Sequence, residues 1–133
     1  MHISLDRLDE AHKALLTETK TLIETLTQTL SLYVQDPASH SLQALPDYLK
    51  ELSGAALFLG SSAQQTALLT AANFAQNRLN QNLALDAEQV NCILNVVAGL
   101  DLLVDNLKNK QPVLQSMFDV ALSSSQQLQN IAA

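Results

Sequence analysis

A long run of apolar residues at helical spacing near the start of the chain constrains the fold more than any other feature. Its members recur mainly at three- and four-residue steps: Leu8, Ala11, Leu15, Leu22, Leu26, Leu30 and Tyr33. This spacing lays one apolar stripe along an α-helix, and a helix of about 30 residues is about 45 Å long. The alternating threonines of the same stretch favour a strand, but a strand would put the leucines on both faces. The sequence therefore predicts a bundle-length helix over about residues 5–34.

Four further helices follow, at about residues 42–59, 62–81, 87–108 and 112–130. Pro46 predicts either a short first turn and a kink in the second helix, or a main helix that starts with Pro46 at its first position. Asp86 with Gln89 is expected to form a capping box at the start of the fourth helix. The alanine-rich face of the third helix allows a close approach to the second. No segment has a strand pattern, so the predicted fold is all-α: one domain over residues 1–133, an up-and-down four-helix bundle with an additional fifth helix.

The charge balance argues against several classes of partner. The chain has 7 Lys and Arg residues against 13 Asp and Glu residues, and its pI is about 4.7. It would repel phosphate backbones and anionic lipids, so no nucleic-acid partner is expected. We find no signal peptide, and no apolar run comes near the roughly 18 residues that span a bilayer, so we predict a cytoplasmic protein without membrane insertion.

The histidines and the cysteine do not predict a metal site. His2, His12 and His40 contain no pair at four-residue spacing, and Cys92 is the only cysteine. A single cysteine also excludes an internal disulfide and fits a reducing compartment. We predict that Cys92 is a buried apolar residue, that Met117 and Phe118 belong to the core, and that the protein uses no cofactor.

The stretch from Tyr48 to Gly60 combines helical apolar spacing with a glycine inside the helix. Gly54 stands beside Ser53, Ala55 and Ala56, which gives the helix a thin surface. A glycine within a helix costs about 1 kcal/mol relative to alanine, so such a surface needs a reason. The reason is either tight packing against the third helix or the docking of a partner.

The residues from Lys50 to Gly60 resemble the signature of histidine phosphotransfer (HPt) domains, which is His-x-x-Lys-Gly, small residues, an apolar residue and Gly. The long first helix, the Asp36-Pro37 turn, and the stretches 74–80 and 83–107 are similar to the N-terminal phosphotransfer domains of chemosensory histidine kinases that control type IV pili. The resemblance covers most of the chain. It implies an HPt-type bundle in bacterial two-component phosphorelay signalling.

The departures from this signature affect the reacting residues. Lys50 stands where the phosphoacceptor histidine belongs, and Ser53 stands where the supporting lysine belongs. A histidine attacks phosphorus with a neutral imidazole nitrogen, which is available near neutral pH. An exposed lysine amine is almost entirely protonated at pH 7 and lacks the free electron pair. We therefore predict that Lys50 marks a degenerate phosphoacceptor position and that the protein is not an enzyme.

The leading hypothesis is a pseudo-HPt domain that acts as a non-catalytic interaction module. The resemblance implies a response-regulator receiver domain or a histidine kinase as its partner. The docking face is predicted on the exposed side of the second and third helices, around Asp47, Lys50, Glu51, Ser53, Gly54 and Phe58. Because Asp47 and Glu51 leave this patch slightly negative, electrostatic steering toward an acidic receiver pocket would be poor.

Two alternatives stay open. The first is an active phosphotransfer protein that uses a displaced histidine, His12 or His40. The second is an unrelated bundle, such as an export chaperone that binds an amphipathic partner helix in an apolar groove.

Overall fold

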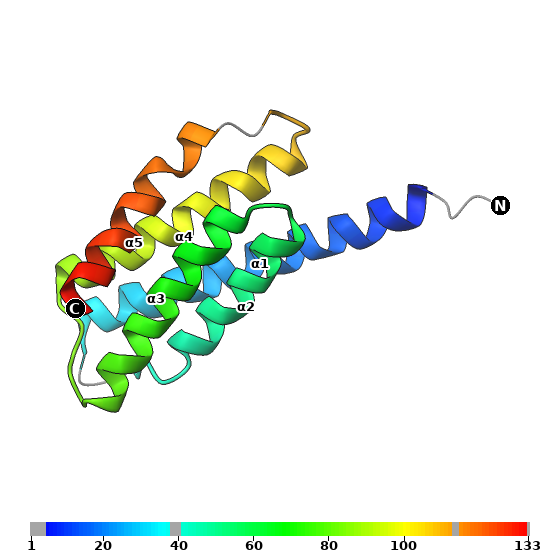
Figure 1. The fold of residues 1–133 in the computed structure, drawn as a ribbon. Coiled ribbons are helices and arrows are strands. Elements are labelled where there is room, and N and C mark those ends of the chain that lie inside the picture. Colours follow the sequence, from blue (N-terminus) through cyan, green and yellow to red (C-terminus); the bar gives the residue numbers. More distant parts are fainter. Residues whose placement is uncertain (1–4, 38–40, 113–114, 133) are drawn as a thin grey trace.

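The computed structural model describes residues 5–37, 41–112 and 115–132, and this part of the chain is helical without any strand. Consecutive α-helices run in alternate directions (Figure 1). The elements are α1 (Leu5–Gln35), α2 (Leu45–Phe58), α3 (Ser62–Asn80), α4 (Ala87–Lys108), the 3-10 turn η1 (Gln115–Phe118) and α5 (Asp119–Ala132). The predicted all-α bundle is confirmed, although α2 and α5 begin later than expected.

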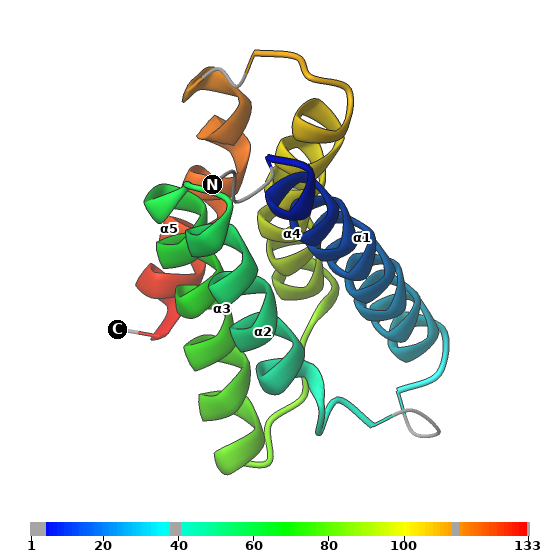
Figure 2. The ribbon, with the colours of Figure 1, turned by 90° about the vertical axis from the view of Figure 1, so that its right-hand side faces the viewer.

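The helices form a four-helix bundle with α5 as the additional helix. The most extensive contact joins α2 to α3, and α1 packs on α4 and α2. The fifth helix lies against α3 and α4 (Figure 2). Because α1 is more than twice as long as α2, its N-terminal part extends beyond the other helices (Figure 1).

Local signals set the helix starts much as the sequence predicts. Pro46 lies in the first turn of α2, where its missing N–H has no cost. Ser61 caps α3, since its Oγ accepts a hydrogen bond of 3.1 Å from the backbone N–H of Gln64. The capping box of α4 is confirmed: the backbone N–H of Gln89 donates to Asp86 Oδ1 at 2.8 Å, and Gln89 Oε1 accepts from the Asp86 N–H at 3.0 Å.

Three helices end in the same backbone motif, with a left-handed residue just after the cap. Two backbone hydrogen bonds define this motif. At the end of α4, the N–H of Gln111 donates to the carbonyl of Asn106, and the N–H of Lys110 donates to the carbonyl of Leu107. The left-handed residue is Gly60 (φ 94°) after α2, Asn82 (φ 56°) after α3 and Lys110 (φ 55°) after α4. Glycine and asparagine adopt this conformation readily, whereas a lysine loses about 1 kcal/mol there.

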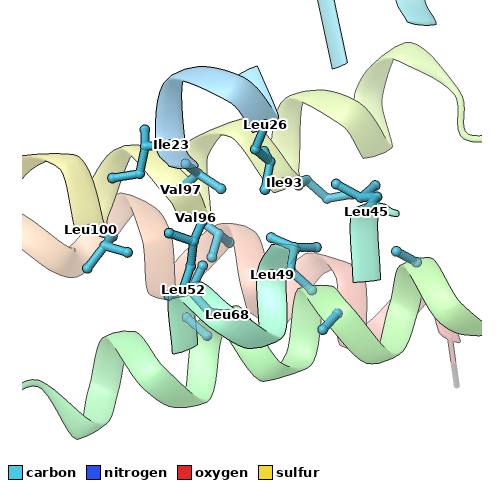
Figure 3. Close-up of a cluster of buried hydrophobic side chains, with 14 of the residues drawn as sticks. Ile23, Leu26, Leu45, Leu49, Leu52, Leu68, Ile93, Val96, Val97 and Leu100 are labelled. Atoms are coloured by element: carbon cyan, nitrogen blue, oxygen red, sulfur yellow. The ribbon is translucent and has the colours of Figure 1, made fainter. Parts of the chain in front are cut away.

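The core lies where α1, α2, α3 and α4 meet (Figure 3). Its largest fully buried side chains include Leu26, Leu30, Leu45, Leu49, Leu52, Leu68, Ile93 and Leu100. The alanine-rich face of α3 packs there as predicted, with Ala71, Ala72 and Ala75 buried. Phe118 is buried, as predicted, and the side chain of Met117 lies outside the described residues.

The apolar stripe of α1 differs from the predicted one by one position in its first half. Leu16 and Ile23 are buried, whereas Leu15 and Leu22, predicted to face inward, are only partly buried. The apolar face of α1 is wide enough to include both pairs, since neighbours along a helix differ by only about 100°. Leu8 and Ala11 lie outside the described side chains.

A close junction of α3, α4 and α5 forms around a glycine that the sequence pattern did not single out. The fully buried Gln64 donates from Nε2 to the Val96 carbonyl at 2.6 Å. A Cβ at Gly99 would lie 2.6 Å from Gln64 Oε1 and 2.7 Å from Ala121 Cβ. The three helices can therefore meet here only because residue 99 has no side chain.

An ion-pair cluster fixes α1 on α4. Lys20 Nζ donates to Asp101 Oδ1 at 2.6 Å and to Asp105 Oδ1 at 3.2 Å. The hydrogen bond to Asp101 is the main cause that raises the pKa of Lys20, against an opposing effect of partial burial. The groups are about a third exposed, so this contact contributes at most about 1 kcal/mol.

One helix, α4, is long and apolar enough to cross a membrane by length and composition, which the prediction from apolar runs missed. Half of its 18-residue window is buried inside the bundle. Core helices pass the same test, so this property does not distinguish a membrane span from the core helix seen here.

Candidate functional site

A groove of about 440 Å³ runs between α1 and α2. Helix α2 contributes one wall, made of Glu51, Leu52, Gly54, Ala55 and Phe58, and α1 contributes the other, made of Leu15, Glu18, Thr19 and Leu22. The floor is mostly apolar, and two carboxylates stand among the lining side chains. Such a groove can hold an apolar side chain of another molecule.

Five of the six predicted docking residues are exposed on α2. They follow one another at steps of three and four: Asp47, Lys50 or Glu51, Gly54 and Phe58. Phe58 is 72% exposed, which is unusual for one of only three phenylalanines in the chain. The groove beside them is closed by α1, and α3 contributes no lining residue to it. The predicted docking face on α2 and α3 stays a prediction.

Ser53 does not belong to the exposed surface, and its predicted place there is wrong. Its side chain is 4% exposed, and Oγ donates a hydrogen bond of 2.6 Å to the carbonyl of Lys50. The residue lies on the core side of α2, next to the buried Leu52. Residue 53, which the resemblance to HPt domains places at the supporting lysine, therefore faces inward in this chain.

Gly54 has no structural reason to be a glycine in this bundle. A Cβ at this position would have no atom within 4 Å, and the residue is exposed. Tight packing against α3 is thus excluded as the reason for Gly54. The buried neighbour Ala56 does have the packing role that was considered for the whole stretch.

The α1 wall of the groove was missed by sequence reasoning. Leu15 and Leu22 were assigned to the core because they fit the leucine stripe, and the neighbouring Glu18 and Thr19 were not considered. The available signal was the second apolar pair, Leu16 and Ile23, one residue further along. Two adjacent apolar stripes on one helix indicate two contact surfaces.

Comparison with models of known protein families identifies the family of this bundle. The model of the FimL C-terminal domain matches residues 6–125. The chain belongs to this family. FimL is related to pilus chemosensory signalling, so the family agrees with the predicted chemosensory-associated helical domain. No curated protein and no solved structure matches the chain.

The other candidate residues lie away from the groove of this FimL-family domain. His12 lines a different cavity, between α1 and α4, and His2 and His40 lie outside the described residues. Cys92 is buried as predicted, and its Sγ donates to Gln127 Oε1 at 3.1 Å.

Cys92 is unsuited to nucleophilic chemistry. Burial raises the pKa of its thiol, and the carboxylates of Glu88 and Asp86 raise it further. Within the described ranges, no group of three or more His, Cys, Asp or Glu side chains could hold a metal ion.

Proposed function

We propose that this FimL-family domain is a degenerate HPt-like module that binds a signalling protein in the α1–α2 groove without transferring phosphate. The family supports a role related to pilus chemosensory signalling. The observation that carries the proposal is Gly54, a helix-destabilising residue that the fold does not require and that keeps the groove surface open.

The energetic argument concerns the difference between the two helical glycines. Gly99 is needed because a side chain there would collide with α3 and α5. Gly54 has the same cost of about 1 kcal/mol relative to alanine, and no contact among the described residues compensates for it. The open surface at Gly54 would allow the backbone or a side chain of a partner to approach α2 closely.

Loss of transfer follows from the residues at the reacting position. Lys50 is exposed where the resemblance expects the acceptor histidine, and a lysine does not supply the neutral imidazole nitrogen that attacks phosphorus. The alternative of a displaced phosphoacceptor relies on His12 or His40. Of these two, His12 lies within the described residues, and it lines a cavity other than the groove. It would not meet a partner that docks along Gly54.

The charges of the groove narrow the docking mode of the proposed partner, a receiver domain or a histidine kinase. Glu18 and Glu51 line the groove, and Asp47 lies one turn earlier on α2. A negative rim repels the acidic phosphorylation pocket of a receiver. The partner therefore presents a different surface, with an apolar side chain for the groove and neutral or basic residues around it.

Blocking the groove with a neutral side chain tests the proposal. We expect Gly54→Gln to weaken binding of a receiver or kinase domain from the same chemosensory system by about tenfold or more, because the side chain fills the point of closest approach. The matched control is Ala98→Gln, at an exposed position of α4 outside the described cavities. Calorimetric titration measures both affinities, and equal affinities for the two variants would contradict the proposed docking site.

The export-chaperone alternative has one observation in its favour, the apolar floor of the groove. The family assignment to FimL weighs against it. The same titration with a pilus-system domain and with an amphipathic export substrate separates the two functions. Location in the cytoplasm and the lack of nucleic-acid or membrane partners stay predictions from composition.

A further inference from the structure

A second cavity, of about 330 Å³, lies between the C-terminal end of α4 and the N-terminal half of α1. Its polar lining is basic, with His12 and Lys13 from α1 and Lys108 and Lys110 from the end of α4. Three of the chain's 7 Lys and Arg residues thus line one cavity in a protein of net charge −6. Among the side chains that the structure describes, no carboxylate lines it.

These lysines are not neutralised by the part of the chain that the structure describes. The ion pairs found there involve Lys20, which binds Asp101 and Asp105, and neither aspartate lines the cavity. Positive charges that converge without a counter-charge repel one another, which opposes folding. An anion between them removes this repulsion.

Ordinary helix-end electrostatics accounts for only part of the cluster. Lysines at the end of α4 complement the negative end of its dipole. This explanation does not apply to Lys13, which lies in the first half of α1, far from the C-terminal turn where a lysine complements the dipole. It also does not explain the left-handed backbone of Lys110, since Gly60 and Asn82 occupy the equivalent places after α2 and α3.

We infer that this cavity, lined by His12, Lys13, Lys108 and Lys110, binds a small soluble anion that carries phosphate. A phosphate group supplies more than one negative charge at a single point, which matches several ammonium donors better than one carboxylate does. Leu16 and Leu107 give the cavity an apolar side that strengthens the local field.

The net charge favours a small ligand over an acidic protein. At physiological ionic strength, charges more than about 8 Å apart are largely screened, so an anion inside the cavity responds mainly to the lysines around it. A large acidic partner would instead meet the surplus carboxylates on the rest of the surface. An anionic membrane would be repelled for the same reason.

Amide NMR shifts of the labelled protein with pyrophosphate as the probe test the inference. We expect saturable shifts at residues 12–17 and 107–110, and about tenfold weaker binding in the Lys13→Gln, Lys108→Gln double variant. Lys50→Gln is the control, because it removes a positive charge outside this cavity and should leave the affinity unchanged. Equal weakening by Lys50→Gln, or no saturable shift at these residues, would overturn the inference.

Lys110→Gly separates ligand binding from stability. Glycine suits the left-handed backbone, so this variant should melt at the same or a higher temperature while binding pyrophosphate more weakly. Unchanged affinity would remove Lys110 from the site.

Two further probes distinguish the source of the phosphate and the class of ligand. Phosphatidylglycerol vesicles should not bind, nor should a glutamate-rich peptide. If either one bound through these lysines while pyrophosphate did not, the assignment to a small soluble phosphate would be wrong. The site lies outside the α1–α2 groove, so its failure would leave the proposed docking function untouched.

Discussion

Gly99→Ala is expected to lower the free energy of unfolding by about 1–3 kcal/mol, although alanine is the better helix former. The new Cβ would lie 2.7 Å from Ala121 Cβ and 2.6 Å from the side-chain oxygen of Gln64. The end of Gln64 is fully buried and hydrogen-bonded to α4, so it has little room to move, and α5 must shift instead. Chemical denaturation followed by circular dichroism measures the loss.

The matched control for this variant is Gly54→Ala, on an equally helical but open position. Its Cβ meets nothing within 4 Å, so the substitution should raise the free energy of unfolding by up to about 1 kcal/mol. Opposite signs for the two alanine variants are the expected result. A loss of stability in Gly54→Ala would show that the fold does need this glycine and would remove the main support for a docking role.

Ser53→Lys is expected to destabilise the domain by roughly 3 kcal/mol, because it places an uncompensated ammonium group on the core side of α2. Ser53 is buried and bonded to the Lys50 carbonyl, so a lysine must either stay buried or displace the turn to reach water. Thermal and denaturant unfolding measure the effect. Gly54→Lys introduces the same side chain on the exposed face one residue later and should fold normally.

If Ser53→Lys proved as stable as Gly54→Lys, the inward orientation of residue 53 would be wrong. The expected result has a consequence for restoring phosphotransfer. Lys50→His would place an exposed imidazole at the acceptor position, but the supporting lysine cannot be added at residue 53 without disturbing the core. Under the proposed function, this site would differ from an active phosphotransfer site in its packing as well as in its nucleophile.

The sequence predicted the number, order and approximate bounds of the α-helices because local signals determine them. The Asp86 capping box is a short-range interaction that the residue types and spacing specify. The later start of α5 was not predictable from Pro112, since proline fixes its own φ without making the residues after it helical. At α2, the helix begins at Leu45, one residue before the start predicted by the alternative that places Pro46 at the first position.

The residues that α2 contributes to the candidate site could be predicted from the sequence, whereas those that α1 contributes could not. Helical spacing from Gly54 places Lys50, Glu51 and Phe58 on the same side of one helix, which needs no knowledge of the neighbours. Which helix closes the groove depends on tertiary packing, as does the choice between Leu15 and Leu16 as the buried residue. The inward position of Ser53 also depends on tertiary packing, because a serine beside a glycine fits either the buried or the exposed face of a helix.

One experiment tests the central claim of binding without transfer. The labelled domain is mixed with a phosphorylated receiver domain of the same chemosensory system, and phosphate on the chain and amide shifts along the groove are followed in the same sample. We predict shifts at residues of the α1–α2 groove and no phosphate on the domain. Stable phosphate on the chain that disappears in His12→Gln or His40→Gln would contradict this account, as would shifts confined to surfaces outside the groove.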